Sequence, residues 1–462
     1  MRLKVIMLLA ILILAGGCKP AGYGRIESES LTSDETAIPP GRYQQGVDMY
    51  HRGHVRLNSP RTKPTLLWSI TPEVTIDATN VLVDSEGGVW YPDGEAGMLS
   101  TYNLIRLNPD GSVDFEKNML PDALVGMGRG EGGLQAEVGF SIIYPALMCE
   151  GAIIARLDRW IASAEFGTEE PEAKESGYAC LECVDLDGRT RWRTEPIEGM
   201  QVDQDAWRLP QDIVAMPASK TSFNMYSLED GSLIESRDVP GWSVYNIPGP
   251  LQTDDDGWIF NGDNWRDRTE DATFPFIERI SPDGQVVWHK EYSEWSFALP
   301  MTINEEGIIA RGNRYGLEFI DSSNGSVLLS KYSATNELCG VTRDGNFIVA
   351  GCDNENDRAS VRVLDTAGNV IWSIDGRVHG DNDVVVYEDG GILLGHSYGI
   401  TLLNRDGSVR WRVDFNDLGL SSEDWTGRWS VNPQPDGGIV AFASVHNHRY
   451  RGMIFALGRS SE

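Results

Sequence analysis

A hairpin pattern repeats along this chain and restricts its fold more than any other feature. In its clearest copy, Asp406 and Gly407 separate the apolar pair Leu402-Leu403 from a segment that carries Trp411. Asp-Gly between alternating segments predicts a tight β-hairpin, because glycine readily takes the positive φ angle that such turns need. Seven copies predict a β-repeat protein. Their turn glycines are Gly111, Gly188, Gly231, Gly284, Gly325, Gly368 and Gly407.

The residue four places after each glycine is usually large and apolar. In chain order it reads Phe115, Trp192, Glu235, Trp288, Leu329, Trp372 and Trp411. A second, weaker Gly turn precedes each copy, and the one near Asp212 has lost its glycine. Two hairpins in each repeat predict a four-stranded unit, and we expect the tryptophans to pack between units.

The two ends of the repeat region complete one unit between them. Residues 65–69 look like a tryptophan strand but have no hairpin before them, whereas the last repeat stops after the strand at 453–457. This pattern predicts an all-β fold, an eight-bladed β-propeller over residues 64–458, with four-stranded antiparallel blades and an N-terminal strand completing the last blade. The number of blades could be seven if the region 117–182 is degenerate. Its Gly-rich segment 126–133 and acidic segment 165–175 are expected to be long loops.

The N-terminus predicts export and lipidation. Residues 1–17 form a basic, then apolar, then small-residue segment typical of a signal peptide, too short to span a membrane comfortably. Residues 14–18 resemble a bacterial lipobox, which implies cleavage before Cys18 and attachment of lipid to its thiol. Residues 18–63 are interpreted as this lipidated cysteine and a flexible tether. Lys19 resembles an outer-membrane sorting signal, so we expect a lipid-anchored envelope protein, in the outer membrane and facing the periplasm or the surface.

The formal net charge of -30 limits the classes of partner. A chain this acidic is not expected to bind nucleic acid or to dock electrostatically on anionic lipid. The membrane is therefore expected to be reached through the lipid on Cys18. The acidic segment 353–357 has oxygen ligands at alternate positions, but lacks the glycine and the distal glutamate of a calcium-binding EF-hand loop.

The Asp-Gly turns followed by valine and tryptophan resemble pyrroloquinoline quinone (PQQ)-like propeller repeats. That family includes quinoprotein alcohol dehydrogenases and the propeller lipoprotein of the outer-membrane β-barrel assembly machine, which binds no quinone. The resemblance implies the fold over most of residues 64–458, whereas an activity does not follow from it. The repeats at 363–368 and 402–407 lack the family's Thr-Gly pair, and the chain has no adjacent cysteines and no haem-attachment motif. No cofactor is predicted, although PQQ or calcium stays open.

Exported cysteines can form disulfides. Cys339 and Cys352 flank one turn and could meet across it, and Cys149 could meet Cys180 or Cys183 across adjacent strands. Cys180 and Cys183 could alternatively be half of a zinc site or a redox pair, but residues three apart on a strand lie on opposite faces.

Candidate binding residues are expected on the face opposite the Gly turns, where loops vary between repeats. Arg and aromatic residues make effective binding hot spots, and they gather in these loops despite the acidity of the chain. The tentative set is Trp265, Arg266, Arg268, Arg314, Tyr315, His396, Tyr398, His446, His448, Arg449, Tyr450 and Arg451. His446 and His448 could hold a metal if extended, and no catalytic residue is predicted.

These features together predict an exported, lipid-anchored propeller that acts as a binding or scaffold protein for an envelope protein or ligand on the loop face. The alternatives are a periplasmic quinoprotein-like oxidoreductase, or an envelope enzyme with its site at the propeller mouth.

Overall fold

The computed structural model describes most of the repeat region. The described residues are 55, 57–72, 81–94, 101–119, 127–130, 133–149, 151–166, 173–198, 206–209, 212–219, 222–238, 251–253, 257–262, 276–282, 285–292, 301–313, 316–332, 336–353, 358–375, 384–396, 399–419, 425–434, 436–446 and 451–458. Within them, no helix is long and apolar enough to cross a membrane.

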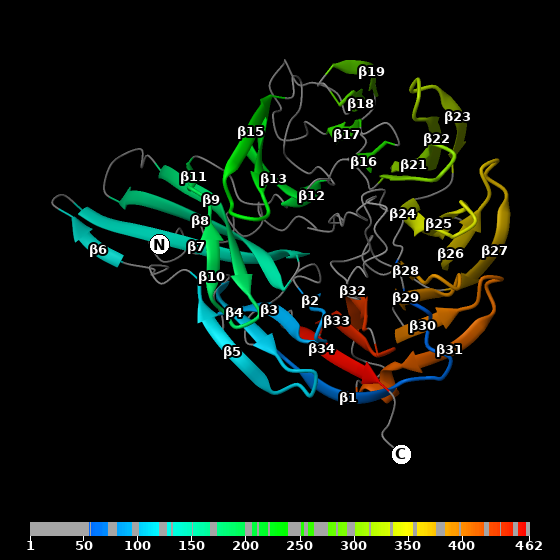
Figure 1. Ribbon diagram of the computed structural model, residues 1–462, viewed down its shortest axis with the longest axis horizontal. Coiled ribbons are helices and arrows are strands. Elements are labelled where there is room, and N and C mark those ends of the chain that lie inside the picture. The colour runs from blue at the N-terminus through cyan, green and yellow to red at the C-terminus, as the bar shows by residue number, and fades with distance from the viewer. Residues whose placement is uncertain are drawn as a thin grey trace.

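Eight antiparallel sheets form a ring (Figure 1), so the prediction of an eight-bladed β-propeller is confirmed. In each blade the first strand lies nearest the centre and the fourth at the rim. Blade 1 consists of β2 (Leu82–Val83), β3 (Val89–Gly94), β4 (Thr101–Leu107) and β5 (Val113–Asn118). Blade 3 consists of β12 (Trp207–Leu209), β13 (Ile213–Ser219), β14 (Ser222–Ser227) and β15 (Leu233–Asp238). Blade 4 consists of β16 (Leu251–Gln252), β17 (Trp258–Gly262), β18 (Phe276–Ile280) and β19 (Val286–Glu291).

The next three blades follow the same order around the ring. Blade 5 consists of β20 (Met301–Ile303), β21 (Ile308–Asn313), β22 (Gly316–Asp321) and β23 (Val327–Tyr332). Blade 6 consists of β24 (Asn336–Val341), β25 (Phe347–Asp353), β26 (Arg358–Leu364) and β27 (Val370–Asp375). Blade 7 consists of β28 (Val384–Val386), β29 (Ile392–His396), β30 (Gly399–Leu403) and β31 (Val409–Asp414), followed by the short 3-10 helix η3 (Phe415–Leu418).

Blade 8 joins the two ends of the ring, as the sequence predicts. It contains β32 (Trp425–Pro433), β33 (Ile439–His446) and β34 (Arg451–Gly458), and its fourth strand is β1 (Thr65–Ile70). β1 pairs antiparallel with β34, so that Thr65 lies opposite Gly458 and Ile70 opposite Ile454. The hydrophobic core is divided among the interfaces between blades; one buried cluster, for example, joins Val440 and Phe442 of blade 8 to Val83 and Val89 of blade 1.

Two turns of each of blades 1 to 7, and one turn of blade 8, lie on one side of the ring, because successive strands run in opposite directions. We call this side the turn face and the opposite side the loop face. The turn glycines have positive φ, for example 80° at Gly390 and 83° at Gly407. At the position that has lost its glycine, Asp212 takes the same conformation with φ 55° and is the one described non-glycine residue that does so.

The tryptophans pack between blades, as expected. The ring of Trp372 in blade 6 lies against Gly407 of blade 7, where a Cβ atom would approach Cδ2 to 2.6 Å. The indole Nε1 of Trp68 donates a hydrogen bond to the carbonyl of Pro109 in the next blade (2.8 Å), and that of Trp288 to Ser322 (2.9 Å). A left-handed residue without a side chain is therefore required under the rings of Trp68, Trp192, Trp288 and Trp372.

Residues 57–63, assigned to the tether by sequence, run across the turn face of blade 7. The Leu57 carbonyl accepts a hydrogen bond from the Glu388 amide (2.9 Å), and Ser59 Oγ donates to Asp389 (2.5 Å). The Pro60 carbonyl accepts from Trp411 Nε1 (3.1 Å), in the position that a turn carbonyl holds for Trp68, Trp192 and Trp288. We call residues 57–63 the strap.

Blade 2 differs from the other seven in size. It contains β6 (Met127–Gly130), β7 (Gly133–Cys149), β8 (Ala152–Phe166), β9 (Ala173–Asp185), β10 (Thr190–Arg193) and β11 (Ile197–Glu198). β7 has 17 residues and β8 has 15, and in Figure 1 both extend well beyond the ring. The expectation of long loops is therefore wrong for the strand residues 127–130, 133, 165–166 and 173–175, whereas the rest of these two segments lies outside the described residues. The β-strand alternation of residues 134–142 and 159–166 extends the blade where turn glycines gave no signal.

Candidate functional site

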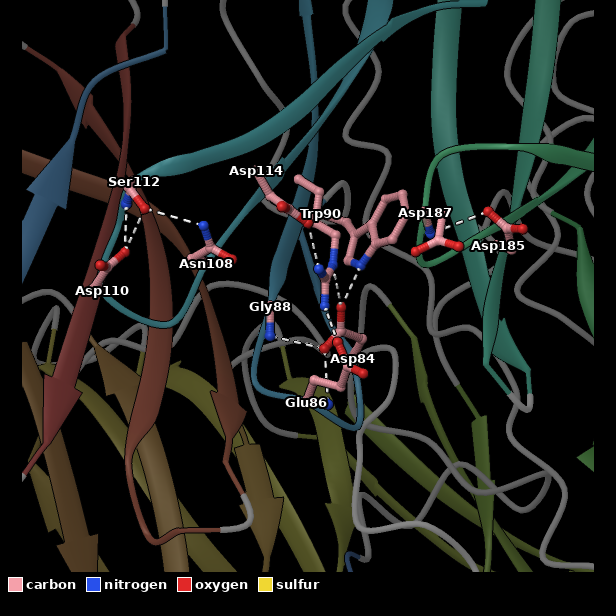
Figure 2. A network of polar contacts seen from close by, with 11 residues as sticks. Asp84, Glu86, Gly88, Trp90, Asn108, Asp110, Ser112, Asp114, Asp185 and Asp187 are labelled. Atoms are coloured by element: carbon pink, nitrogen blue, oxygen red, sulfur yellow. Dashed lines mark hydrogen bonds and ion pairs between the residues drawn. The ribbon is translucent and has the colours of Figure 1, made fainter.

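On the turn face, the buried Asp84 is the centre of a polar network in blade 1, which Figure 2 shows. Its Oδ1 accepts hydrogen bonds from the backbone amides of Glu86 (2.9 Å) and Gly88 (2.8 Å). Its Oδ2 accepts from Trp90 Nε1 and from Arg106 Nε, both at 2.8 Å. One carboxylate thus satisfies four donors in the protein interior.

Arg106 uses its remaining nitrogens on two further carboxylates. Nη1 donates to Asp114 (2.5 Å) and Nη2 to Glu86 (2.7 Å). A Cβ atom at Gly88 would lie 2.5 Å from Asp84 Oδ2, so glycine makes room for this arrangement. Since the polar groups bond to one another, the network holds the turn and the two strands together, and we assign it a structural role.

A related arrangement fixes the strap to blade 7. Asp389 accepts hydrogen bonds from Ser59 Oγ and from the Gly391 amide (3.1 Å), and Arg410 donates to Ser59 Oγ. Burial raises the pKa of Asp389, but the bonds from Ser59 and Gly391 and the nearby Arg410 together hold it below its ordinary value. The charged form of the carboxylate is therefore the one that this contact stabilises.

On the other side of the ring, ionisable side chains are buried in the second strands of three blades. Arg156 and Asp158 of β8 are 0% and 1% exposed, Arg311 of β21 is 0% exposed, and His396 of β29 is 2% exposed. These residues lie four to seven places past the turn glycine of their blade, toward the loop face. Ionisable groups buried in this way are candidates for function, because burial perturbs them most.

Arg156 and Asp158 lie two apart on one face of β8. Arg156 Nε donates to Asp158 Oδ1 (2.7 Å), while the two terminal nitrogens of Arg156 have no hydrogen-bond partner. Burial of a guanidinium with a single bonded nitrogen is energetically unfavourable. The two terminal nitrogens of Arg156 could therefore donate to an anionic or carbonyl group that reached them.

Arg311 lies at the interface of blades 4 and 5. Its guanidinium carbon lies 4.1 Å from the centre of the Tyr292 ring, and its Nη1 is 3.9 Å from Glu318 Oε2. Stacking on an aromatic face stabilises a buried guanidinium. Burial, ahead of the nearby charges, raises the pKa of Tyr292, so its phenol is neutral and retains its hydrogen.

His396 was predicted as part of a loop hot spot, and the structure places it at the buried end of β29. Its Nε2 lies 2.7 Å from Thr401 Oγ1, which also accepts a hydrogen bond from Arg412 Nε (3.1 Å). Burial lowers the pKa of His396 to about 4, with a further contribution from the charge of Arg412. The imidazole is thus neutral near pH 7, and it forms part of the interior of blade 7.

The other candidate binding residues from the sequence analysis are only partly described. His446 ends β33 opposite Trp425, and Arg451 begins β34 opposite Val445. The structure brings these two strand ends together at the loop face of blade 8, but their side chains lie outside the described part. The remaining positions lie outside the described residues altogether: Cys18, Trp265, Arg266, Arg268, Arg314, Tyr315, Tyr398, His448, Arg449 and Tyr450.

Sequence reasoning missed Arg156, Asp158 and Arg311. A signal was present, since residues 152–158 read Ala-Ile-Ile-Ala-Arg-Leu-Asp, with two charges inside an apolar strand. In a half-buried strand such charges alternate outward, but the second strand of a blade is covered on both faces. Because candidate residues were sought only in the loops, the buried charges within the strands were overlooked.

The cysteine prediction for blade 2 is wrong. Cys180 and Cys183 are buried free thiols, and Cys149 lies on β7, which is separated from β9 by β8. Burial raises the pKa of Cys180 to about 12, which keeps it protonated and unreactive. The side chains of Cys339 and Cys352 lie outside the described part. The described ranges contain no group of three or more His, Cys, Asp or Glu residues that could hold a metal ion.

Comparison with solved structures identifies the architecture. A europium-containing methanol dehydrogenase matches 91% of this chain and 98% of its own, at a TM-score of 0.55 and 11% identity. The quinohemoprotein alcohol dehydrogenase from Comamonas testosteroni matches 92% of this chain and 82% of its own, at 0.56 and 12%. The chain has a quinoprotein-type propeller fold. BamB from Moraxella catarrhalis covers 86% of this chain and 99% of its own, at a TM-score of 0.44 and 14% identity.

The likeness to quinoprotein-type propellers concerns the fold alone. No family model matches the chain, and no curated protein matches its sequence. The adjacent cysteines that the quinone-dependent members use have no counterpart here, because none of the six cysteines is next to another. The residues present therefore do not fit that arrangement.

Proposed function

We propose that the chain is an exported propeller protein, lipid-anchored through Cys18 at the cell envelope, where it binds another protein or a ligand as a scaffold. Residues 1–17 are the signal peptide in this proposal, and the tether that follows Cys18 leads to the strap. Outer-membrane placement, facing the periplasm or the surface, rests on the sequence around Lys19.

The extension of blade 2 carries this proposal. Seven blades close the ring with four short strands, whereas β7, β8 and β9 continue for 13 to 17 residues. Register pairs run from Cys149↔Ala152 at the turn to Leu134↔Phe166 at the far end. Ring closure does not require the extra length of these strands, since neighbouring blades elsewhere in the ring pack together through strands of about six residues. A regular sheet that extends beyond the ring supports a role in binding.

The position of the strap indicates which side of the ring is nearest the tether. It is fixed to the turn face of blade 7 by Ser59 and Pro60, and Lys63 Nζ lies 2.7 Å from Asp417 in η3, which follows β31. The tether therefore joins the body on its turn face. The loop face lies on the side of the ring opposite that junction, and in this proposal it shares binding with the blade 2 extension.

The test compares the wild type with a trimmed chain in which residues 134–142 and residues 159–178 are each replaced by a short Gly-containing loop. The strand ends that remain, such as Asp158 and Ala179, are opposite one another in the sheet. Both proteins are cross-linked in cells and purified from membranes. A partner recovered at stoichiometric level with the wild type and lost with the trimmed chain is expected. A trimmed chain that keeps its melting temperature and recovers the same partner equally would contradict the role of the extension.

The oxidoreductase alternative is tested on the same preparation. Purified wild-type protein is incubated with PQQ and calcium, and its absorbance and dye-linked alcohol oxidation are measured. We expect neither a quinone band that stays with the protein after gel filtration nor turnover. Both together would replace the binding proposal with an enzyme.

A further inference from the structure

The same β-bulge occurs in the outermost strand of all eight blades. In blade 4, Ile280 pairs with Val286 and Arg279 with Trp288, so that Val287 is skipped. A bulge of this kind leaves one residue outside the pairing and redirects its side chain. The eight skipped residues are Leu67, Asp114, Arg191, Ile234, Val287, Leu328, Ile371 and Arg410.

In three blades the skipped residue is charged and bonds back to the protein. Asp114 accepts from Arg106, Arg191 donates to the Gly151 carbonyl (2.8 Å), and Arg410 bonds to Asn404 and Asp389. These blades are 1, 2 and 7. Because the bulge forms equally well with a charged residue, the fold itself does not require an apolar side chain at this position.

In blades 3 to 6 the skipped residue is apolar and about half exposed, and so is the residue before it. We call these eight residues the apolar arc: Leu233, Ile234, Val286, Val287, Val327, Leu328, Val370 and Ile371. In the described part of the chain, every exposed large hydrophobic residue lies on an outermost strand, and the arc accounts for eight of the eleven. β15, β19, β23 and β27, which carry it, belong to consecutive blades (Figure 1).

Acidic turns border the apolar arc. Asp230 precedes Gly231, and a hydrogen bond from the Ser232 amide, with others from Ser232 and Ser227, holds its pKa below the ordinary value. The Ser323 hydroxyl and amide act in the same way on the pKa of Asp321 in blade 5. Both carboxylates are therefore ionised at neutral pH, and the chain as a whole is strongly acidic. A partner that contacts the arc must meet this negative charge, which favours lysine and arginine.

The bulge also restricts how a partner can attach. An outermost strand exposes unpaired backbone groups, but a bulge bends the edge and disfavours addition of another strand there. Contact through side chains remains. Repeated apolar pairs on four neighbouring blades provide it, whereas isolated exposed residues would need no explanation.

We propose that the apolar arc is a docking surface for a protein whose contacting surface combines apolar side chains with lysine and arginine. This proposal specifies the kind of partner that the protein would bind, and so it rests on the proposed function. It lies on the rim of blades 3 to 6 and is separate in the chain from the extension of blade 2.

The test uses the purified mature protein and a fluorescently labelled amphipathic Leu–Lys peptide, with binding followed by anisotropy at 150 mM salt. The arc variant carries I234T, V287T, L328T and I371T. The control carries V113T and V409T in blades 1 and 7, where the skipped residue is charged. All three proteins have the same net charge. We expect at least tenfold weaker binding by the arc variant and less than twofold change in the control.

Equal binding by all three proteins would overturn the proposal, because charge alone would then explain it. Binding of a Leu–Glu peptide or of phosphatidylcholine vesicles with equal strength would also overturn it. Far-ultraviolet dichroism checks folding, and the paired variants I234T/V287T and L328T/I371T keep the test decisive if the fourfold variant misfolds. A normal partner yield from the arc variant in cells would reject the arc while leaving the binding function intact.

Discussion

The indole of Trp411 donates its hydrogen to the carbonyl of Pro60, a residue 351 positions earlier in the chain. For Trp68, Trp192 and Trp288 the acceptor belongs to the turn of the next blade. Blade 8 has no such turn, because its third and fourth strands come from opposite ends of the chain. The strap therefore supplies the missing acceptor, and ring closure is supported by a side chain of blade 7.

Replacement of Trp411 by phenylalanine should weaken the strap. The loss of one buried hydrogen bond and part of the ring should cost about 1–2 kcal/mol of unfolding free energy. Limited proteolysis should then cut near residues 55–65 faster than in the wild type. Trp288→Phe is the control: it loses the equivalent bond to Ser322 and should be destabilised similarly, but its strap should resist cleavage. Equal cleavage in both variants would contradict the role of Trp411.

Alanine at two turn glycines separates backbone strain from contact with tryptophan. Gly407 and Gly437 have nearly the same φ, 83° and 85°, but a Cβ atom meets Trp372 at 2.6 Å only at Gly407, and nothing within 4 Å at Gly437. Both variants should lose about 1–2 kcal/mol to strain. Gly407→Ala should lose about 1–3 kcal/mol more through overpacking. The urea midpoints check this, and identical values would show that Trp372 moves aside freely.

The Asp84 network should respond differently to its buried and exposed members. Asp84→Asn leaves Arg106 poorly compensated in the interior and should cost about 3 kcal/mol or more. Asp114→Asn removes a partly exposed negative charge from beside the same guanidinium and should cost about 1 kcal/mol or less. Thermal melting of both variants gives the comparison. Similar losses would mean that Asp84 is not the centre of the network.

The buried His396 should make the protein less stable as pH falls. Its folded pKa of about 4 lies below the ordinary value of 6.5, so the unfolded chain takes up the proton first. The stability that depends on neutral His396 is complete above pH 6.5 and is lost between pH 6.5 and 4. By pH 5 the loss should reach about 2 kcal/mol. His396→Gln should remove this part of the difference between denaturation at pH 7 and pH 5, whereas an unchanged pH dependence would show that other groups cause it.

The repeat made the ring predictable, but not every blade. Asp-Gly turns and tryptophans mark local hairpins, and the unmatched Trp68 strand shows how the ring closes. Blade 2 was harder, because strand length is set by alternation and partners rather than by turns. The pairing of β7 with β8 joins residues up to 32 positions apart, such as Leu134 and Phe166.

The ionisable residues buried in the strands were not predicted, for a physical reason. The repeat predicts where loops lie, so loop residues such as Arg314 were selected. It does not reveal burial within strands, which brought Arg156 and Arg311 into the interior. The eightfold bulge was also missed, because it depends on strand register, although the apolar pairs that follow the Gly-x motif in blades 3 to 6 are visible in the sequence.

Closure of the ring by β1 is the central claim, because the strap, both faces and the rim depend on it. Hydrogen exchange of the β34 amides tests it most directly, in the chain from residue 55 and in a chain from residue 71 that lacks β1. We expect residues 454–457 to be strongly protected in the longer chain and to exchange at least a hundredfold faster in the shorter one. Equal protection in the two proteins would contradict the pairing of β1 with β34.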